Sequence, residues 1–576
     1  MKKIAIVDKD KCKPSACSKE CEKFCPVNRK GEKCVEILSK CKINEDLCIG
    51  CAICAKRCPL SALEIINLPF ADENKLVHRY GENGFALYGL PHPKEGNIVG
   101  FLGRNGIGKT TAIKILSGQE KPNFGKKEID ENDIKNFFKG SELLSYFETL
   151  TKKSISYKPQ NLSFLYVDVG VKDFLLKRGN EEKILELAKK INAESILSKR
   201  LNTLSGGELQ KVAILAASLK ESDIYFFDEP LAYLDIEERI KISKFIEDIT
   251  KGKTTFIVEH DLLILDYLSD YLHIFFGQKG CFGLVSGIKS TSYAINSYLD
   301  GYLKEENIRI REKPINFNFT KNCLVSGDVF SKWPSFKKTY EGFNFECSQG
   351  EIRTGHIYGI LGKNGTGKTT FMKCLAGLEE VEIGGKKEII NLSLKVSYKP
   401  QYVSSDSEEL VRDIVIKEKI DKKICSHFGI ENFYQKKVKN LSGGELQVLA
   451  IVRCLSKEAD IYLLDEPSAY LDVEERVYLA KLIKDFIIEK GKTAFVIDHD
   501  LLLISYIADS IIYFSGERGK YGKLEGIFEF EKGIVKLLQD LDITLRKDKE
   551  SGRPRINKRD SVLDREQKER GEWAIF

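Results

Sequence analysis

Two glycine-rich stretches of this chain have the composition and spacing needed to bind the phosphates of a nucleotide. Residues 103–110 and 362–369 both fit the pattern G-x4-GK[ST], and each stands between an apolar run and a helix-forming segment. That strand–loop–helix context is what a phosphate-binding P-loop requires. The glycines let backbone N–H groups turn toward the phosphates at a helix N-terminus, and the lysine would contact the β- and γ-phosphates. The candidate residues are Gly103, Asn105, Gly106, Gly108, Lys109, Thr110 and Thr111, and then Gly362, Asn364, Gly365, Gly367, Lys368, Thr369 and Thr370.

Two acidic motifs could supply the metal ligand and the base for a reaction at that phosphate. Two apolar runs, which are predicted β-strands, each end in Asp-Glu-Pro. In-line attack of water on a γ-phosphate needs Mg²⁺ and a carboxylate that orients the water. We therefore expect Asp228 and Asp465 to bind Mg²⁺, and Glu229 and Glu466 to act as general bases.

A seven-residue stretch that occurs twice shows that the body of the chain is a duplicated unit. Leu-Ser-Gly-Gly-Glu-Leu-Gln stands at 204–210 and again at 441–447, and Asp-Glu-Pro returns at the same offset. The bland interpretation is a helix start with serine as its N-cap. The repeated motif, followed by the same later motifs, instead resembles the signature of ABC ATPases. The resemblance implies that its serine and glycine cap the γ-phosphate of ATP bound to the opposite repeat, through Ser205, Gly207, Ser442 and Gly444.

The ABC resemblance also assigns roles to residues between these motifs. It implies Q-loop glutamines, D-loop aspartates and switch histidines, which are Gln160, Gln401, Asp235, Asp472, His260 and His499. The implied Mg²⁺ ligands are Thr110, Gln160, Asp228, Thr369, Gln401 and Asp465, and the implied catalytic set is Glu229, Glu466, His260, His499, Lys109 and Lys368. An aromatic ring before each P-loop is expected to stack on adenine. Tyr80 is the first candidate, with Phe85 as an alternative. In the second unit Trp333, Phe336 and Tyr340 all remain open.

Ten of the 16 cysteines lie within the first 58 residues. In a reducing compartment such a concentration favours metal over disulfides. The run C-x2-C-x2-C-x3-C-P at 48–59 matches the bacterial ferredoxin pattern, in which the fourth cysteine binds the neighbouring [4Fe–4S] cluster. The partner run at 12–26 has irregular spacing but the same Cys-Pro ending. The exchange rule predicts one cluster on Cys48, Cys51, Cys54 and Cys25, and another on Cys12, Cys17, Cys21 and Cys58.

Cys34 and Cys41 are left over by this pairing and are expected to be ordinary thiols. Zinc is the alternative metal, although zinc ribbons rarely place four cysteines in one 11-residue run. The clusters could transfer electrons, or they could act as structural staples for a small domain. Lys and Arg outnumber Asp and Glu between residues 2 and 57, which suits docking on RNA or on an acidic partner.

The first repeat carries an insertion that the second lacks. The Q-loop glutamine lies 50 positions after the P-loop threonine in the first repeat and 32 positions after it in the second. The extra residues fall near 131–150, where Asp133 and Ser141 could cap two short helices. We expect a surface helix–loop–helix; a decorative loop is the alternative.

The tail, 546–576, is rich in Lys and Arg and lacks the apolar pattern of a packed helix. It is predicted to be an extended basic strap that contacts RNA phosphate or braces the two repeats. A solvated tail is the bland alternative.

Composition excludes several classes of protein. At 576 residues the chain has room for three or four domains, and its hydrophobic share of 42% and charged share of 31% are typical of a soluble globular protein. No run of 18 uncharged apolar residues occurs, so a transporter subunit with its own membrane part is excluded. The N-terminus lacks the apolar core of a signal peptide, and a cytoplasmic location is expected. A net charge of +6 is too small for a uniformly basic nucleic-acid binder.

In their order along the chain these features resemble the ABC-E subfamily, the RNase L inhibitor or ribosome-recycling ATPases, over essentially the whole length. The phrases that carry the resemblance are IAIVD at 4–8, CIGC at 48–51, HRY at 78–80, KGSEL at 139–143 and RPRINK at 553–558. Cys34 and the Glu-Gln-Lys at 566–568 look more eukaryotic than archaeal. The implied fold is α/β, with a ferredoxin-like α+β iron–sulfur domain (1–70), two head-to-tail ABC-type P-loop nucleotide-binding domains (71–310 and 311–545) and a basic hinge (546–576).

The resemblance implies an ATPase that hydrolyses ATP to ADP and phosphate and splits post-termination or stalled ribosomes into subunits. Further roles in translation initiation and ribosome biogenesis are implied. The expected cofactors are ATP, Mg²⁺ and two [4Fe–4S] clusters. The expected partners are the small ribosomal subunit and its RNA, a class-1 release factor or its pelota-type paralogue, and translation initiation factors. A monomer is expected in the cytoplasm and also in the nucleus, away from membranes.

Two rival functions come from other classes. An ATP-gated electron carrier would change its cluster potential as ATP turns over. A soluble ABC subunit of a membrane transporter would co-purify with a permease rather than with ribosomes.

Overall fold

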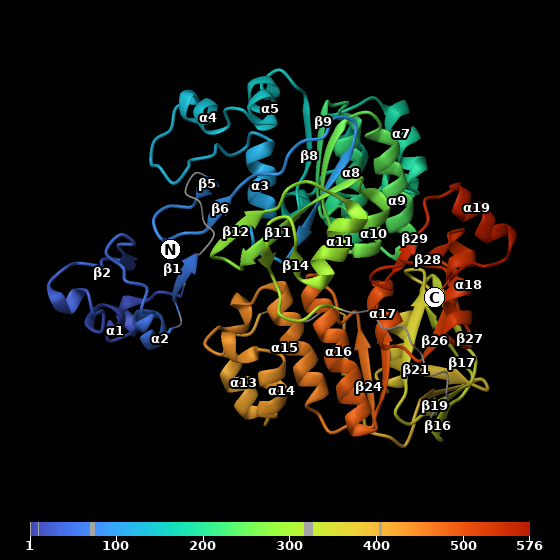
Figure 1. The fold of residues 1–576 in the computed structure, drawn as a ribbon. Helices are drawn as coiled ribbons and strands as arrows, with labels where there is room; N and C mark the ends of the chain where they lie inside the picture. The colour runs from blue at the N-terminus through green and yellow to red at the C-terminus, as the bar shows by residue number, and fades with distance from the viewer. Residues whose placement is uncertain are drawn as a thin grey trace. The chain divides into compact units, whose positions relative to one another are not determined.

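The computed structural model describes residues 2–9, 11–60, 62–68, 75–315, 327–401 and 406–575 (Figure 1). The chain forms two compact units. The first comprises Met1–Pro230, Ile246–His260 and Ser269–Glu312, and the second comprises Leu231–Phe245, Asp261–Leu268 and Lys313–Phe576. The predicted domain boundary at residue 70 lies outside the described residues, and the four predicted domain ranges stay predictions.

The first unit begins with a small module whose core is built largely from cysteine. Strand β1 (Lys2–Val7) pairs antiparallel with β4 (Leu63–Leu68), and β2 (Val35–Ile37) pairs with β3 (Cys41–Ile43). Two short helices, α1 (Glu20–Lys23) and α2 (Ile53–Arg57), complete it. Six of its buried core residues are Cys12, Cys21, Cys25, Cys34, Cys41 and Cys54. So small an apolar core supplies little stability, which is why such a module needs a staple.

This module contacts the rest of the first unit through a half-buried carboxylate, that of Glu45. Glu45 accepts a hydrogen bond from Nη1 of Arg79 at 2.9 Å and another from the backbone N–H of Ala5 at 2.9 Å. The amide of Asn83 donates to the carbonyl of Ile43 at 3.0 Å. Arg79 and Asn83 lie on either side of Tyr80, so the module rests directly beside the candidate adenine-stacking residue.

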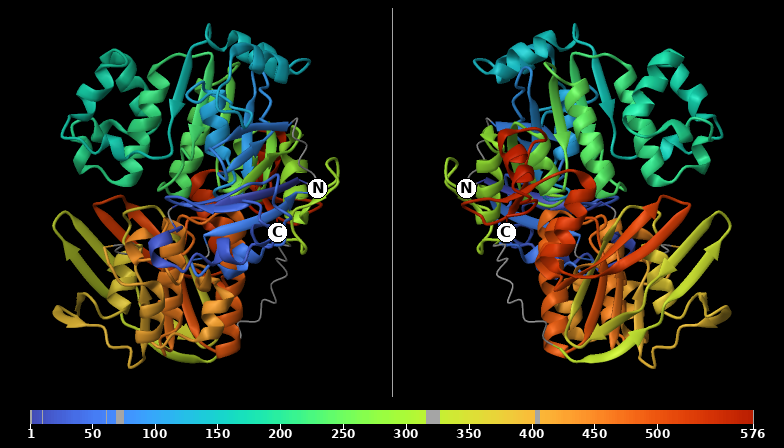
Figure 2. Two further views of the ribbon diagram at one scale, coloured as in Figure 1. Left: turned by 90° about the vertical axis from the view of Figure 1, so that its left-hand side faces the viewer. Right: turned by 90° about the vertical axis from the view of Figure 1, so that its right-hand side faces the viewer.

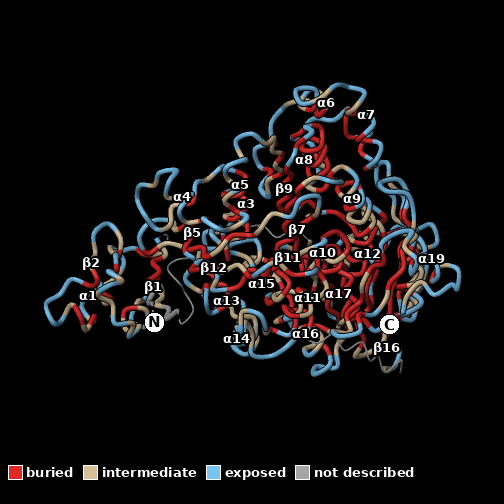
Figure 3. Tube along the Cα trace, turned by 45° about the horizontal axis from the view of Figure 1, so that its top comes forward, coloured by how far each residue is buried: buried red, intermediate tan, exposed pale blue. Residues whose placement is uncertain are grey.

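Parallel strands at the centre of the first unit bring the phosphate-binding and acidic motifs to one edge of a sheet. The strand order is β5-β6-β12-β11-β7-β10-β9-β8, with β13 paired to β11. Strands β7 (Ile98–Gly103), β10 (Thr254–Val258) and β9 (Ile224–Asp228) are parallel and buried throughout, as expected where helices cover both faces (Figure 3). The other strands are β5 (Leu76–Arg79), β6 (Ala86–Tyr88), β8 (Ile155–Lys158), β11 (Tyr271–Gln278), β12 (Phe282–Val285) and β13 (Lys289–Ser290).

Helices pack around this sheet, and two of them begin at sequence motifs that recur in the second repeat. Helix α3 (Lys109–Leu116) follows the first P-loop, and α8 (Gly206–Leu219) follows Ser205. The remaining helices of the first unit are α6 (Val171–Leu176), α7 (Glu181–Lys190) and α11 (Thr291–Asp300). Helix α10 (Leu262–Leu268) belongs to the second unit, and α9 (Ile236–Ile249) begins in the second unit and ends in the first.

The second unit repeats the arrangement in a ten-stranded sheet of order β22-β21-β17-β18-β27-β26-β20-β25-β24-β23. Strands β20 (Ile357–Gly362), β25 (Thr493–Ile497), β24 (Ile461–Asp465) and β23 (Val396–Lys399) are its parallel part. The other strands of this sheet are β17 (Phe336–Tyr340), β18 (Phe343–Cys347), β21 (Glu380–Ile383), β22 (Lys386–Ile389), β26 (Ser510–Glu517) and β27 (Tyr521–Glu529). Strands β16 (Val329–Trp333) and β19 (Gly350–Arg353) form a separate antiparallel pair. Its helices are α12 (Lys368–Leu375), α13 (Val411–Lys417), α14 (Lys422–His427), α15 (Gly443–Leu455), α16 (Val473–Lys490), α17 (Leu501–Ile507) and α18 (Phe530–Leu541).

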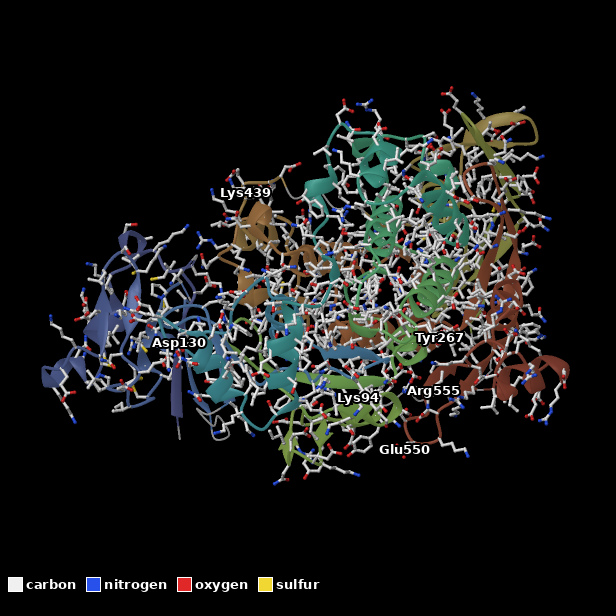
Figure 4. All side chains as sticks on the ribbon, turned by 90° about the horizontal axis from the view of Figure 1, so that it is seen from above. Lys94, Asp130, Tyr267, Lys439, Glu550 and Arg555 are labelled. Carbon is white, nitrogen blue, oxygen red and sulfur yellow. The ribbon has the colours of Figure 1, made fainter. Side chains whose placement is uncertain are left out.

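The predicted insertion is a pair of helices, α4 (Glu131–Phe137) and α5 (Glu142–Leu150), at the periphery of the first unit (Figures 1 and 2). The predicted caps were wrong in detail. Asp130, labelled in Figure 4, is the N-cap of α4, and Asp133 completes a reciprocal capping box three residues later. Ser141 stands at the N-cap of α5, but its hydroxyl donates to the carbonyl of Phe138 at 2.7 Å instead. The hydroxyl of buried Tyr146 donates to the carbonyl of Leu116 at 2.7 Å, which anchors the insertion on α3.

The tail is more ordered than the sequence pattern predicted. Strands β28 (Leu545–Lys547) and β29 (Pro554–Ile556) form an antiparallel pair, and Val562–Glu569 form helix α19. The expectation of an extended strap without a packed helix was therefore wrong. Helix α19 packs through polar side chains: the buried Asp564 accepts a hydrogen bond from the hydroxyl of Thr544 at 2.6 Å. An apolar pattern could not have revealed it.

Candidate functional site

Each P-loop is a tight turn that only glycine can form. Gly108, at the N-terminus of α3, has φ of 97°, and Gly367, at the N-terminus of α12, has φ of 94°. A Cβ atom at either position would also lie within 3 Å of an aromatic ring, that of Phe85 or Phe345. The sequence therefore needs glycine here for both backbone conformation and space. This places Phe85 beneath the first P-loop.

The P-loop lysines fold back over their loops. Nζ of Lys109 donates to the carbonyls of Gly103 at 2.6 Å and Arg104 at 2.8 Å. Nζ of Lys368 donates to the carbonyls of Gly362 at 2.8 Å and Lys363 at 2.7 Å. Both ammonium groups therefore stand at the centre of the loop that would receive the phosphates.

Asp228 and Asp465 are buried carboxylates at the ends of β9 and β24. Both are 0% exposed, and each faces the hydroxyl of its P-loop threonine, Thr110 or Thr369. Burial, followed by the charge of the adjacent glutamate, raises the pKa of each to about 6. A buried carboxylate is stabilised by a cation beside it, and oxygen ligands such as a carboxylate and a hydroxyl are those that Mg²⁺ prefers. These residues therefore fit a magnesium ion.

Glu229 and Glu466 lie in the same environment in the two units. Oε1 of Glu229 accepts a hydrogen bond from Nε2 of Gln160 at 2.7 Å and lies 3.1 Å from Nε2 of His260. In the second unit Oε1 of Glu466 accepts from Gln401 at 2.7 Å and lies 3.3 Å from Nε2 of His499. Both sets join residues that the sequence predicted to act together.

The two glutamates are held ionised and in a strained backbone conformation. Burial by itself raises the pKa of Glu229, but His260, Lys109 and Gln160 outweigh burial and hold that pKa at about 2. The pKa of Glu466 is also about 2, for the same reasons in the second unit. Their φ angles of 46° and 47° are left-handed, which is costly for a residue with a side chain and is typical of functional sites.

Two lysines that the sequence analysis missed hold these acidic loops in place. Nζ of the buried Lys158 donates to the carbonyls of Asp228 and Glu229, both at 2.9 Å. Nζ of Lys399 donates to the carbonyls of Asp465 at 2.7 Å and Glu466 at 3.1 Å. Burial lowers the pKa of each lysine to about 8. The repeated Tyr-Lys-Pro-Gln before each Q-loop was the available signal.

The signature motifs begin helices in both units. Ser205 caps α8 and Ser442 caps α15, each in a capping box with the glutamate three residues later. The helix-start interpretation thus describes their local structure, and it is compatible with a phosphate-binding role because helix N-termini attract anions. Within the second unit, Oδ2 of Asp235 accepts a hydrogen bond from the backbone N–H of Asn364 at 2.8 Å. Asp472 caps α16 through Glu475.

The candidate aromatic of the second unit is Tyr340. Trp333 and Phe336 are 1% and 3% exposed and pack in the core of the sheet, so neither can reach a ligand. Tyr340 is 37% exposed, and its hydroxyl is hydrogen-bonded with Thr370. Tyr80, 41% exposed, has the same arrangement, with its hydroxyl 3.4 Å from Oγ1 of Thr111.

The cysteines gather in two groups within the N-terminal module. One small cavity is lined by Cys25, Cys48, Cys51 and Cys54, the set that the exchange rule predicts, and also by Cys34. In the other group, Sγ of Cys12 accepts a hydrogen bond from the backbone N–H of Cys41 at 3.3 Å, and Cys41 lies beside Cys21. Cys34 and Cys41 are both buried beside predicted ligands, and the expectation that they are ordinary thiols stays a prediction.

The thiol-rich donor set of this module fits iron–sulfur clusters, because thiolates are their ligands. Backbone N–H groups also point at predicted ligand sulfurs, as at Cys58, whose Sγ accepts from Ala62 at 3.4 Å. Such donors tune cluster potentials. Among the described residues, no three Cys, His, Asp or Glu side chains are grouped as they would be around a single metal ion.

Family models match these sites. The model described as "ABC transporter" matches residues 92–232 and 345–469, which contain both P-loops and both Asp-Glu pairs. The chain is an ABC-type ATPase. The model described as "Possible Fer4-like domain in RNase L inhibitor, RLI" matches residues 3–33, so the N-terminal module is an iron–sulfur domain of that type.

Relatives cover essentially the whole chain. An "Uncharacterized ABC transporter ATP-binding protein" of Methanocaldococcus jannaschii is 45% identical over 99% of this chain and 97% of its own. "ABC transporter E family member 1" of Arabidopsis thaliana is 40% identical (99% and 98%), and "Translation initiation factor RLI1" of Saccharomyces cerevisiae is 38% identical (100% and 98%). The chain belongs to the E family of ABC proteins, which includes the RNase L inhibitor. These relatives are archaeal and eukaryotic, so the predicted eukaryotic source stays a prediction.

Solved structures agree with this assignment. The chain matches a "Model of ribosome-bound archaeal Pelota and ABCE1" with a TM-score of 0.93, 42% identity, and coverage of 100% of this chain and 99% of that one. It matches archaeal "ribosome recycling factor aABCE1", solved with ribosomal stalk protein aP1, with a TM-score of 0.83, 42% identity, and coverage of 88% and 100%. No helix in the described part of the chain is both long enough and apolar enough to cross a membrane.

Proposed function

We propose that this ABC-E protein is an ATP-driven ribosome recycling factor that splits post-termination or stalled ribosomes into subunits. The observation that carries the proposal is the likeness over the full chain to a ribosome-bound ABCE1 and to a named recycling factor. Two complete sets of catalytic residues support an ATP-driven reaction. Roles in translation initiation and ribosome biogenesis are part of the proposal, and the name of the yeast relative supports the first.

The proposed partners follow from the relatives. They are the small ribosomal subunit and its RNA, a class-1 release factor or its pelota-type paralogue, and translation initiation factors. The relative bound to the ribosome with Pelota supports contact with the ribosome and with a pelota-type factor, and the relative solved with a ribosomal stalk protein supports contact with the ribosome. A cytoplasmic monomer, also present in the nucleus, is the proposed state.

The proposed cofactors are ATP, Mg²⁺ and two [4Fe–4S] clusters. Mg²⁺ would neutralise charge on the β- and γ-phosphates, held by Asp228, Thr110 and Gln160 in the first site and by Asp465, Thr369 and Gln401 in the second. The cavity formed by Cys25, Cys48, Cys51 and Cys54 supports one cluster. Cys12, Cys17, Cys21 and Cys58 are the proposed ligands of the other.

The chemistry of the chain's own residues follows from their geometry. Lys109 and Lys368 would bind the phosphates where they now contact their loop carbonyls. Glu229 and Glu466, held ionised, would orient a water and accept its proton, while His260 and His499 face the same carboxylate oxygen. Each ATP would be capped by the signature of the other repeat, so binding favours a closed state and hydrolysis releases it. Closure would move the iron–sulfur module against the release factor or its pelota-type paralogue.

Sucrose-gradient sedimentation tests this proposal. With a non-hydrolysable ATP analogue, the protein should move from the top of the gradient to the small-subunit fraction. Co-purification with a permease, or a cluster potential that changes with ATP turnover, would instead favour the transporter or electron-carrier alternative.

A further inference from the structure

The two nucleotide sites differ in the residue beside the candidate adenine-stacking tyrosine. Each tyrosine contacts the threonine that ends its GKTT sequence, and a glutamate stands nine residues beyond that threonine, Glu120 in one unit and Glu379 in the other. Two residues before the tyrosine, the first unit has His78 and the second has Lys338. The surroundings of the two tyrosines are therefore alike in sequence except for one ionisable side chain.

In the first unit the three side chains form one contiguous group. The hydroxyl of Tyr80 donates to Oε2 of Glu120 at 2.8 Å, and Oε1 of Glu120 lies 3.2 Å from Nε2 of His78. The rings of His78 and Tyr80 meet edge to face, with centroids 4.6 Å apart. His78 is buried, at 4% exposed.

In the second unit a lysine replaces the histidine in the same group. Nζ of Lys338 lies 2.9 Å from Oε2 of Glu379 and donates to the carbonyl of Glu380 at 2.7 Å. The same ammonium lies 5.0 Å from the centroid of the Tyr340 ring, within the range of a cation–π contact.

The side-chain groups around Tyr80 and Tyr340 carry different net charges at neutral pH. Burial works against the charged form of Lys338, but Glu379 outweighs burial and raises the pKa of that lysine, so the pair is neutral overall. Burial lowers the pKa of His78, opposed in part by Glu120, so the first group carries one negative charge until His78 gains a proton. Among the described residues, the charged group recorded against the His78 ring is Glu120, and Lys121 faces the ring with its backbone. The next residue, Arg79, is paired with Glu45.

We propose that His78 and Lys338 are positioning residues that set the nucleotide affinities of the two sites apart, and that the first site alone strengthens as pH falls. The inference rests on the proposed adenine-stacking role of Tyr80 and Tyr340. The nucleotide is an anion, so a net negative charge next to its base weakens binding and protonation of His78 relieves that repulsion. One unit charge about 10 Å from the singly charged magnesium complex of a nucleoside diphosphate in water changes affinity by about twofold.

Single-site variants of the full-length protein separate the two affinities. Lys368→Ala leaves the first site, and Lys109→Ala leaves the second. The affinity of each for the magnesium complex of the fluorescent nucleotide mant-ADP is measured between pH 5.5 and 8.0. Protonation of the nucleotide affects both sites equally, so the ratio of the two dissociation constants isolates the protein's contribution. We expect that ratio to shift by about twofold in favour of the first site at low pH.

Exchanging the two residues gives the matched controls. His78→Lys should remove the extra pH dependence of the first site, and Lys338→His should confer it on the second. His78→Gln, which is neutral and close in size, should give a first site of weak, constant affinity, and it serves if the lysine variant folds poorly. Equal pH dependence at the two sites of the parent protein would overturn the inference. Failure of the wild-type protein to bind mant-ADP at all would instead contradict the nucleotide sites themselves.

Discussion

Nε2 of His260 lies 3.1 Å from the Oε1 atom of Glu229 that also accepts a hydrogen bond from Gln160. Two residues from separate segments thus meet one oxygen of a third, the carboxylate of Glu229. The same convergence occurs on Glu466 in the second unit. These contacts hold the orientation of each carboxylate, and the predictions below follow from them and from the elements that support them.

Lys158 should support catalysis through the backbone of the acidic loop. Lys158→Met leaves the carbonyls of Asp228 and Glu229 without their donor, which costs roughly 1–3 kcal/mol for each carbonyl. We expect kcat of the first site to fall by about tenfold or more while KM changes little, because the P-loop is untouched. Lys399→Met is the matched variant of the second site. Single-turnover hydrolysis measures both, and unchanged rates would show that neither lysine positions its loop.

Lys158 should also make the free energy of unfolding depend on pH. Its pKa is about 8 in the folded protein and near 10.4 in an unfolded chain, so between these values the unfolded state binds more protons. The stability of the wild type should therefore rise with pH, relative to Lys158→Met, from about pH 8 to about 10.4. Urea unfolding midpoints across this range test the sign. A difference that shrinks as pH rises would contradict it.

The exchange of ligands between the two cysteine runs can be tested with Cys25. Cys25→Ser removes one ligand of the cavity that it shares with Cys48, Cys51 and Cys54, and iron content should drop from about eight atoms per chain toward about four. Cys58→Ser should have a similar effect, and both should impair splitting. ATP hydrolysis should largely survive, because Lys109 and Glu229 lie outside the module. Cys34→Ser is the control and should retain iron; anaerobically purified protein with zinc and no iron–sulfur absorbance would refute the clusters.

The insertion should contact ribosomal RNA through its exposed lysines. Deleting 133–150 should weaken binding to the small subunit, but it would also remove Phe138, Leu143 and Tyr146 from the core of the first unit. The charge reversal Lys135→Glu with Lys139→Glu leaves that core intact. It should weaken small-subunit binding and lower the slope of log affinity against log salt by about two.

A matched pair of reversals on another face of the first unit, Lys177→Glu with Lys189→Glu, controls for net charge. Both of these lysines are exposed. Equal losses in the two double variants would mean that the insertion has no specific role.

The tail should stabilise the second unit through a buried ion pair. Nη1 of Arg553, which is 0% exposed, lies 2.9 Å from Oδ2 of Asp266 on α10, and Nε of Arg555, labelled in Figure 4, lies 2.7 Å from the same oxygen. Arg553→Met should cost about 1–3 kcal/mol, because Arg555 still pairs with Asp266. The exposed pair of Arg559 with Asp542 is the control, and Arg559→Met should cost about 1 kcal/mol or less. Both tryptophans, Trp333 and Trp573, belong to the second unit, so their fluorescence reports its unfolding. Equal midpoints for the two variants would contradict the bracing role.

The sequence could predict the P-loops and the acidic pairs, because the spacing of these residues by itself specifies the local turn. Gly103 to Thr110 and Asp228 with Glu229 occupy the predicted strand ends. It could not choose among the three aromatics of the second unit, since that choice depends on burial: Trp333 fills the core and Tyr340 does not. It missed Lys158, because a buried lysine at the end of a strand can be predicted only when its hydrogen-bond acceptors are known. It missed α19, because polar contacts such as Thr544 to Asp564 leave no apolar period.

The central claim is that ATP holds this protein closed on the small ribosomal subunit until hydrolysis releases it. Glu229→Gln with Glu466→Gln keeps the size of both side chains but removes the charge that activates water, so hydrolysis should fall by a factor on the order of 10² or more while ATP binding persists. The decisive measurement is a gradient of ribosomal fractions probed for this double variant in the presence of ATP. The variant should accumulate with small subunits, carry ATP in both sites and block further recycling in a dominant-negative way. A variant that binds ATP yet stays at the top of the gradient would contradict the claim.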